Sequence, residues 1–449
     1  DERKRYMIYL YRDNYKTIEE LSEKEMRLAG LRINPQKNIG SRVSYYNNIE
    51  ISLIQNNKPE FLKVKGLPKN PRLSNIKWSP DQTMIAFTNT TFDGVELWVL
   101  DLKKVKLKKL TSPRLNANLG SVINWFKDSK SLLVKFVPPK TEAIKMTEDL
   151  VPSGPRISTN DGAKAQNRTY QDLLKNKNDE KNFEILALSE LYKVSIKGSK
   201  RLWKKRDMYR NINFSPDGRF VLITTIKRPF SYLVPYYRFP STYTIYGSTG
   251  KQVAVLADIP LIEDLPKGFM SVRKGARSFS WRLDKPASIY FVTALDGGDP
   301  QVESEFRDEL FQIDAPFNAD PSSLLKTKNR FYRSSWCNDT LAIVSDYWWN
   351  NRNAKTYLFN PSNPQDGSMI LSDRNYQDRY NDPGSFVKER NNFGENILAL
   401  RNNSLYLIGD GFTSKGQFPF LDKLDLSTMA KNRLYKSNIN GKKESLRDF

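Results

Sequence analysis

The residues with the clearest potential for chemistry are the cations Arg273, Lys274 and Arg277, which surround Gly275 just before an apolar segment. An Arg guanidinium is a planar fork that binds a carboxylate through two parallel hydrogen bonds. The cluster therefore predicts binding of an acidic group. The alternative is that these cations pair with acidic side chains of the chain itself or at a domain interface, and the sequence leaves both interpretations open.

A second pair of cations, Arg228 and Arg238, flanks the aromatic segment Pro-Phe-Ser-Tyr-Leu-Val-Pro-Tyr-Tyr. Aromatic rings beside Arg suit a peptide groove or a protein interface, because both offer flat apolar faces next to a charge. The alternative is a loop at the edge of a sheet that packs its own aromatic side chains. We expect these two Arg to contribute to substrate binding in the first case only.

Several kinds of catalytic and metal site are excluded by composition. The chain has no His and a single cysteine, Cys337, so it cannot assemble a Ser-His-Asp triad, a His-ligated zinc site or an internal disulfide. Asp296-Gly-Gly-Asp299 resembles a calcium loop, but two Asp with Gly also make an ordinary tight turn, which we favour. We expect Cys337 to be a buried apolar residue. No catalytic residue, no metal and no cofactor are predicted within this chain.

The chain of 449 residues is strongly basic, with a formal net charge of +22. Such a charge is compatible with nucleic acid, an acidic membrane surface or acidic substrates. The cations are scattered, however, and no nucleic-acid-binding motif accompanies them. No segment approaches the roughly 18 apolar residues of a membrane span. We therefore expect neither nucleic acid nor a membrane span.

One pattern recurs along the chain: an aromatic residue, a short polar turn with Asp, and an apolar strand. The copies begin at Trp78, Trp125, Phe214, Trp281 and Trp336. In Phe214-Ser-Pro-Asp-Gly, Pro presets the turn, Asp bonds its own backbone, and Gly supplies positive φ. Repeated strand pairs of this kind predict an all-β fold built from the blades of a β-propeller, with helical and loop insertions.

Insertions interrupt the repeats. Residues 14–30 carry a capping-box pattern at Thr17 and Glu20, and we expect a helix that ends near Gly30. Residues 138–192 read as an inter-blade insertion whose latter part is helical. The polar loop at 348–356 contains Trp348, Trp349 and Asn350, which suit a plug between blades or, alternatively, a peptide platform. The remainder of residues 1–449 is assigned to the propeller.

Several blocks of sequence together resemble the glutamyl endopeptidase branch of the prolyl oligopeptidase superfamily. They occur in the family's order and span nearly the whole chain: Arg27-Leu-Ala-Gly-Leu-Arg-Ile-Asn, Val151-Pro-Ser-Gly-Pro-Arg-Ile, Lys227-Arg-Pro-Phe-Ser-Tyr-Leu-Val-Pro, Ser271-Val-Arg-Lys-Gly-Ala-Arg-Ser, Ser335-Trp-Cys-Asn-Asp-Thr-Leu-Ala and Tyr380-Asn-Asp-Pro-Gly-Ser. The family joins an N-terminal propeller to a C-terminal α/β-hydrolase domain with a Gly-x-Ser-x-Gly nucleophile. This chain has neither that motif nor His, so it resembles the propeller part only.

The resemblance implies a serine peptidase as the parent protein, with a propeller of about seven blades that is incomplete in this chain and with the Ser-Asp-His triad beyond residue 449. It further implies that the propeller limits access to the active site and helps to recognise peptides with Glu at P1. Arg273, Lys274, Arg277, Arg228 and Arg238 are then the candidate ligands of the substrate carboxylate. The expected partners are a peptide substrate, the C-terminal hydrolase domain and a cell-envelope protein complex. The expected location is the periplasm or the bacterial cell surface.

A different class of function remains open. The chain ends soon after a blade segment, before a closing strand, and we expect it to be part of a longer polypeptide. On its own it is predicted to be inactive. The alternative is a non-catalytic propeller that serves as a scaffold or binding subunit of a larger cell-envelope assembly. The coding sequence beyond Phe449 distinguishes the two, since only the peptidase requires a Ser nucleophile there.

Overall fold

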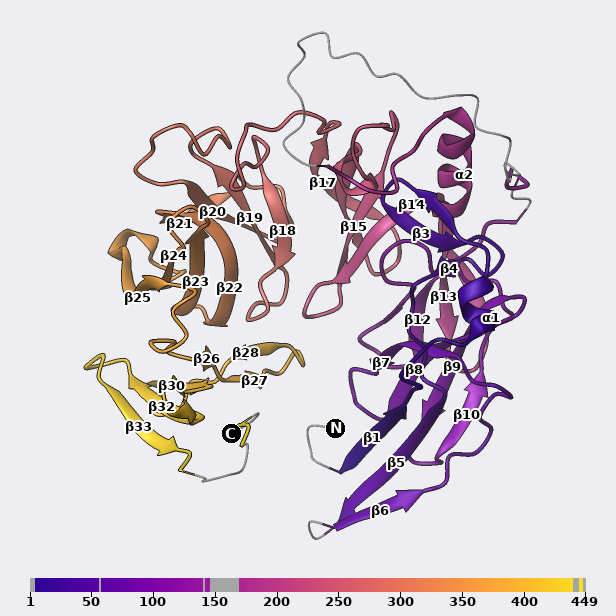
Figure 1. Cartoon of the computed structure of the whole chain (residues 1–449), viewed down its shortest axis with the longest axis horizontal. Coiled ribbons are helices and arrows are strands. Elements are labelled where there is room, and N and C mark those ends of the chain that lie inside the picture. Colours follow the sequence, from indigo (N-terminus) through magenta and orange to yellow (C-terminus); the bar gives the residue numbers. More distant parts are fainter. Residues whose placement is uncertain (1–4, 56–57, 140–141, 146–168, 439–443, 447–449) are drawn as a thin grey trace. The chain divides into compact units, whose positions relative to one another are not determined.

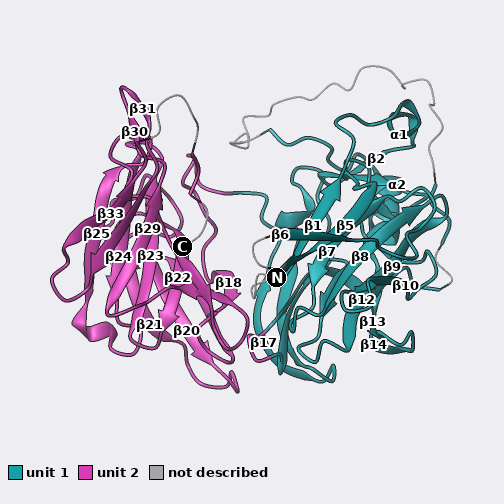
Figure 2. Cartoon of the chain, turned by 90° about the horizontal axis from the view of Figure 1, so that it is seen from below, with its two compact units in different colours: residues 1–214, 218–264 teal, residues 215–217, 265–449 magenta. Residues whose placement is uncertain are grey.

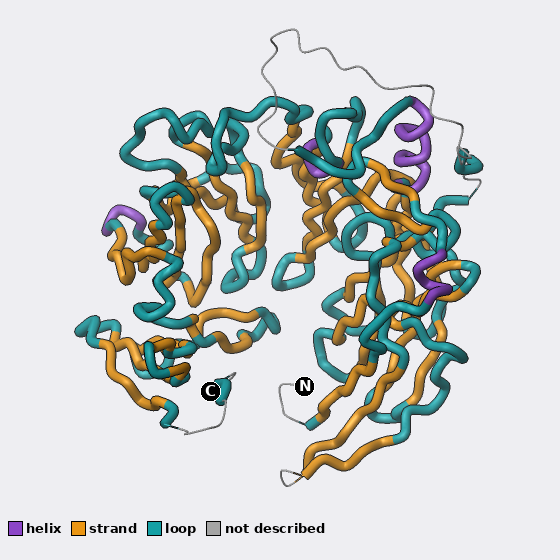
Figure 3. The backbone as a smooth tube through the Cα atoms, viewed as in Figure 1, coloured by secondary structure: helices purple, strands orange, loops and turns teal. Residues whose placement is uncertain are grey.

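The computed structural model describes residues 5–55, 58–139, 142–145, 169–438 and 444–446 (Figure 1). Strands dominate, and the few helices lie between them (Figure 3). The chain divides into two compact units: unit 1 comprises residues 1–214 and 218–264, and unit 2 comprises residues 215–217 and 265–449 (Figure 2). Among the described residues, no helix combines the length and apolar character that crossing a membrane would require.

Unit 1 is built from consecutive antiparallel sheets. The first contains β1 (Tyr6–Tyr11), β5 (Asn48–Gln55) and β6 (Lys58–Leu62), and the second contains β7 (Leu73–Trp78), β8 (Met84–Thr91), β9 (Gly94–Asp101) and β10 (Lys106–Lys109). The third runs through β11 (Ile123–Trp125), β12 (Ser131–Phe136), β13 (Ser189–Ser195), β14 (Lys200–Phe214), β15 (Phe220–Ile226), β16 (Ser241–Gly247) and β17 (Gln252–Ile259). The long strand β14 pairs with β13 through its first half and with β15 through its second half, so this sheet corresponds to two four-stranded blades that share one strand.

Unit 2 continues with three more four-stranded antiparallel sheets. The first contains β18 (Arg277–Trp281), β19 (Ser288–Ala294), β20 (Asp308–Asp314) and β21 (Ser322–Thr327), and the next contains β22 (Arg330–Asn338), β23 (Leu341–Trp348), β24 (Asn353–Phe359) and β25 (Ser368–Asn375). The last contains β26 (Ser385–Phe386), β29 (Ser404–Gly409), β32 (Phe420–Asp425) and β33 (Lys431–Lys436). The succession of such sheets along the chain confirms the predicted all-β, propeller-type fold.

Short elements decorate these sheets. The helices are α1 (Ile18–Ser22), α2 (Lys177–Ala187) and the 3₁₀ turns η1 (Tyr236–Arg238) and η2 (Pro364–Asp366). The small strands are β2 (Met26–Leu28), β3 (Leu31–Asn34), β4 (Ile39–Gly40), β27 (Lys388–Arg390), β28 (Asn396–Leu398), β30 (Phe412–Thr413) and β31 (Gly416–Gln417). They lie at the loops and edges, where a polar backbone can reach solvent.

The recurring aromatic unit marks the hairpin between the first and second strands of a sheet. Each aromatic lies at or near the end of the first strand and faces an apolar residue of the second: Trp78 opposite Ile85, Trp125 opposite Leu132, Phe214 opposite Val221, Trp281 opposite Ile289 and Trp336 opposite Ala342. Alternation along the strands then directs apolar side chains into layers between neighbouring sheets, such as the core that joins Trp336 with Val292 and Leu310.

The helix expected over residues 14–30 is shorter than predicted. It begins at the Thr17 cap, where both capping-box hydrogen bonds to Glu20 are present, but it ends at Ser22. Residues 26–34 form the hairpin β2–β3 instead, and Gly30 lies in its turn with φ +85°. The reason is tertiary, because Leu28 and Ile33 pack into a core with Phe183 of α2.

The insertion expected over residues 138–192 is helical in its latter part, as predicted, through α2. Strand β13 begins at Ser189, so the insertion ends before residue 192. Residues 140–141 and 146–168 of this segment lie outside the described residues.

Candidate functional site

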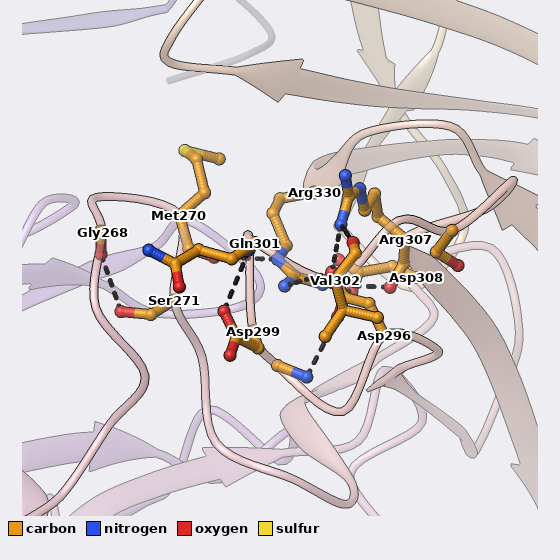
Figure 4. A network of polar contacts seen from close by, with 12 residues as sticks. Gly268, Met270, Ser271, Asp296, Asp299, Gln301, Val302, Arg307, Asp308 and Arg330 are labelled. Carbon is orange, nitrogen blue, oxygen red and sulfur yellow. Dashed lines mark hydrogen bonds and ion pairs between the residues drawn. The ribbon is translucent and has the colours of Figure 1, made fainter.

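The loop that carries Arg273 and Lys274 is fastened to a tight turn in unit 2. The backbone N–H of Val272 donates to the carbonyl of Gly298 at 3.0 Å. A Cβ at Gly298 would lie 2.0 Å from the Val272 carbonyl oxygen, and its φ is +85°, so only Gly fits there. Arg330 Nε donates to the carbonyl of Met270 at 2.9 Å. The segment that precedes Arg273 is therefore held by the Asp296–Asp299 turn at Val272 and by Arg330 at Met270, the latter two being labelled in Figure 4.

A buried network of charges lies beneath this loop. Arg330 binds Asp296 at 2.7 Å and Asp308 at 3.1 Å, and Arg307 binds Asp296 at 2.9 Å (Figure 4). Arg277, the first residue of β18, binds Asp308 from another direction. The side chains of both Asp are at most 1% exposed. Three guanidinium groups thus share two carboxylates, which leaves the network with one surplus positive charge.

Arg277 carries a spare hydrogen-bond donor. Its Nη2 binds Asp308, whereas its Nη1 is buried and has no hydrogen-bond partner among the described residues. Burial lowers the pKa of Arg277, and the neighbouring Arg330 acts in the same direction, although Asp308 opposes both. A buried donor without an acceptor costs free energy, so this nitrogen favours the approach of an additional acceptor.

Arg273 and Lys274 occupy a different position from Arg277. Lys274 is exposed, and its side chain passes over Gly297, where an added Cβ would lie 3.6 Å from Lys274 Cε. Arg273 is half-buried and donates through Nη1 to the Lys274 carbonyl at 2.7 Å. Lys274 is therefore the exposed cation of the three, whereas Arg273 is half-buried and the Arg277 side chain is 14% exposed.

The polar loop at 348–356 contributes aromatic rings to the same region. Trp348 lies against Arg307, whose Cζ is 4.5 Å from the ring centroid. Trp349 stacks on Phe269 at 4.1 Å between centroids, and Phe269 is 61% exposed. Trp348 thus covers the Arg307 side of the charge network. The Phe269–Trp349 pair presents an apolar face beside the cationic loop.

The Asp296–Asp299 turn is an ordinary tight turn. Oδ1 of Asp296 accepts a hydrogen bond from the backbone N–H of Gly298 at 3.0 Å, and Oδ2 binds Arg307 and Arg330. Nowhere in the part of the chain that the structure describes do three or more His, Cys, Asp or Glu side chains gather as metal ligands. A carboxylate already bound to two guanidinium groups has no strong tendency to hold a cation.

The two unit 1 candidates are engaged with their surroundings. Arg228 binds Glu184 at 2.7 Å and Glu180 at 3.1 Å, both on α2, and its Cζ lies 4.4 Å from the centre of the Phe230 ring. Arg238, at the end of η1, lies over the ring of Tyr170 at 5.2 Å. The structure therefore brings Arg273, Lys274 and Arg277 together and places Arg228 and Arg238 in unit 1, on another segment.

Sequence reasoning missed Asp308, Arg307 and Arg330, which hold Arg277 and its loop. It also missed two buried lysines in unit 1. Lys77 donates to Ser121 at 2.6 Å and to Asn124 at 2.8 Å, and Lys135 donates to the carbonyls of Leu119 and Tyr209. Lys135 lies inside the apolar segment Ser-Leu-Leu-Val-Lys-Phe, and this position in the sequence could have indicated that it is buried.

Burial lowers the pKa of Lys77 to about 8 and that of Lys135 to about 7. The residual charge on Lys77 contributes to the lower value for Lys135. Cys337 is buried, as predicted, and burial raises its pKa to about 11, which keeps the thiol protonated and unreactive.

Comparison with known proteins identifies relatives by sequence. No family model matches the chain. A probable chloroplastic glutamyl endopeptidase of Oryza sativa subsp. japonica is 35% identical over 96% of this chain and 48% of its own length. Its counterpart in Arabidopsis thaliana is 32% identical over 96% of this chain and 47% of its own length.

Solved structures with similar folds include a prolyl endopeptidase, with a TM-score of 0.44 and 12% identity over 97% of this chain and 51% of that one. They also include the β-propeller domain of the Trilobed protease from Pyrococcus furiosus, with a TM-score of 0.38 and 12% identity over 96% of this chain and 97% of that one. Over 96% of its length the chain is similar in sequence to two probable glutamyl endopeptidases, and it spans about half the length of these curated relatives.

Proposed function

We propose that this chain is the propeller region of a serine endopeptidase that cleaves peptides after acidic residues. The observation that supports the proposal is the sequence relationship to glutamyl endopeptidases over 96% of the chain. The chain has no His, so the Ser-Asp-His triad of such an enzyme must come from another part of the parent protein. In this proposal the propeller restricts entry to that triad and contributes side chains that select the substrate.

The selecting side chains in this proposal are those of the 273–277 loop. The half-buried Arg273 and the exposed Lys274 are assigned to the Glu carboxylate, which Arg can bind through two hydrogen bonds. Arg277 lies behind them with an unused donor, and the surplus charge of its network adds to the attraction. The Phe269–Trp349 pair offers an apolar surface for the rest of the peptide.

The fixed positions of these groups support a role in recognition. The loop is anchored by Arg330 and by the Gly298 carbonyl, so little conformational freedom is lost when a ligand binds. Arg228 has a different place in the proposal. Because both of its guanidinium arms bind Glu residues of α2, we assign it to the stability of unit 1.

The test compares the full-length parent protein with residues 1–449 on a fluorogenic peptide that contains a single Glu. We expect hydrolysis after Glu by the full-length protein, inhibition by a serine-directed reagent, and no hydrolysis by residues 1–449. Hydrolysis by residues 1–449 alone would overturn the proposal, because it would place the catalytic groups within this chain. A full-length protein that cleaves no peptide would also overturn it and would favour the scaffold function.

A further inference from the structure

A cavity of about 360 Å³ lies in unit 2 between the sheet β22–β25 and the sheet that contains β26, β29, β32 and β33. Its volume falls within the range of roughly 300–1,000 Å³ typical of small-molecule sites. It adjoins the apolar core that fills the rest of the space between these sheets, where Ile343, Leu405 and Leu407 are buried. The cavity is separate from the 273–277 loop, whose residues do not line it.

One wall of the cavity is a row of polar side chains across all four strands of one sheet. Arg333 of β22 is paired with Ser345 of β23, which is paired with Thr356 of β24, which is paired with Ser372 of β25. Directly paired residues of antiparallel strands point to the same face. The row therefore brings one guanidinium and three hydroxyl groups to the same side, and all four residues line the cavity.

The facing wall is apolar. Phe386, Leu407, Leu424 and Met429 come from the last sheet and its loops, and each lines the cavity. Met369 and Ile370 of β25, which are 48% and 49% exposed, add apolar lining from the opposite sheet. Since Met side chains adapt to irregular shapes, the apolar wall can accommodate ligands of differing form.

The charges that line the cavity have one sign. Arg333, Lys388 and Lys431 are positive, and none of the described residues that line it is acidic. Lys431 has a distant ion pair with Asp422 at 3.8 Å. Both Arg333 and Lys388 line the cavity, and partial burial, followed by repulsion from the positive charge of Arg333, lowers the pKa of Lys388. An anion between them would relieve that repulsion.

We propose that this cavity binds a small organic anion with an apolar body, in the class of aliphatic and aromatic carboxylates. The carboxylate lies between Arg333 and Lys388, with the hydroxyl row as further donors, and the body packs on Phe386, Leu424 and Met429. A cationic ligand would meet three like charges, and a neutral apolar ligand would leave the two close cations uncompensated. The site is distinct from the proposed peptide-recognition loop and does not depend on it.

The experiment measures octanoate binding to residues 1–449 by titration calorimetry, with octylamine and octan-1-ol as probes of equal chain length. We expect saturable binding of octanoate at one site, at least tenfold weaker binding of octan-1-ol, and no binding of octylamine. The double variant Arg333→Gln/Lys388→Gln should weaken octanoate binding by at least tenfold. The matched control Lys415→Gln, at an exposed position away from the cavity, should leave it unchanged.

Both variants should give the far-ultraviolet circular dichroism spectrum of the unsubstituted chain, because all three cations are at the surface. Three results would overturn the proposal: no octanoate binding up to millimolar concentration, equal binding of octylamine, or octanoate affinity that is unchanged in the double variant. A loss of affinity in Lys415→Gln as large as that in the double variant would also overturn it, since it would show attraction by net charge alone.

Discussion

The two segments that the sequence marks as carboxylate-binding candidates hold their arginines in opposite ways. In unit 1, Arg228 meets two Glu side chains of α2 and is 47% exposed, so its charge is fully compensated at a wet surface. In unit 2, Arg277, Arg307 and Arg330 share Asp296 and Asp308, and the network keeps a surplus positive charge. Both segments are rich in Arg, but Arg228 faces two Glu side chains, whereas the unit 2 network has three guanidinium groups for two carboxylates.

This difference shows that the number of cations in a segment predicts anion binding less well than the number of carboxylates that the cations already face. A compensated Arg stabilises an interface between elements, here α2 and the 228–238 segment. An undercompensated network is retained at a cost to stability, which is typical of functional sites. The following predictions test whether the two segments differ in this way.

The largest effect is expected for Asp308→Ala. Asp308 accepts hydrogen bonds from Arg277, Arg330 and the backbone of Phe331, so its removal leaves two buried guanidinium groups poorly compensated. We expect a loss of about 3–5 kcal/mol in the free energy of unfolding of residues 1–449. Guanidinium chloride unfolding, followed by tryptophan fluorescence, measures it. A loss below about 1 kcal/mol would show that the network is not a buried charge cluster.

The second-largest effect is expected for Lys135 of unit 1. This buried cation is 1% exposed, and it forms no ion pair with a carboxylate among the described residues. Its folded-state pKa, about 7, lies below the value near 10.5 expected in the unfolded chain. At a pH between these two pKa values, Lys135 binds more protons in the unfolded chain than in the folded chain. The free energy of unfolding therefore rises as the pH is raised. From pH 7 to pH 9 we expect Lys135 to contribute an increase of about 2 kcal/mol in the free energy of unfolding.

The variant Lys135→Met isolates this contribution, because other titrating groups are present in both proteins. Unfolding free energies at pH 7, 8 and 9 should rise more steeply for the unsubstituted chain than for the variant. Parallel curves would contradict the assignment of Lys135 as a buried, uncompensated amine. The Arg network should show no such slope, because guanidinium groups stay protonated throughout this range.

The smallest effect is expected for Arg228→Ala. Its ion pairs with Glu180 and Glu184 are partly exposed and screened by solvent, so their loss should lower the free energy of unfolding by at most about 1 kcal/mol. The effect should shrink further in 1 M salt. A loss as large as that of Asp308→Ala would remove the contrast between the two segments.

The part of the fold that follows from local chemistry was predictable from the sequence. The turn after Phe214 has Pro, Asp and Gly at the positions that close a hairpin, and β14 and β15 pair there. The helix that begins at Thr17 was predictable at its start, where the cap is local. Its end was not, since the hairpin β2–β3 depends on packing against α2, which is distant in the sequence.

The candidate site was predictable as a cluster of cations but not as a network. Arg277 binds Asp308, and Arg228 binds Glu180 and Glu184, over long separations in the sequence that no local pattern encodes. Composition could count the acidic residues but could not say which arginines they compensate. The distinction between the exposed Lys274 and Arg277, whose side chain is 14% exposed, likewise depends on where β18 begins.

The most direct test of the central claim is the selectivity of the full-length protein for Glu over Gln at P1, measured as the ratio of kcat/KM for two otherwise identical peptides. We predict that Arg273→Gln/Lys274→Gln lowers this ratio by about 10–100-fold, through weaker binding of the Glu carboxylate. Arg228→Gln, the matched control from the compensated segment, should leave the ratio unchanged. Equal losses on both peptides in the double variant, or an unchanged ratio, would contradict the account.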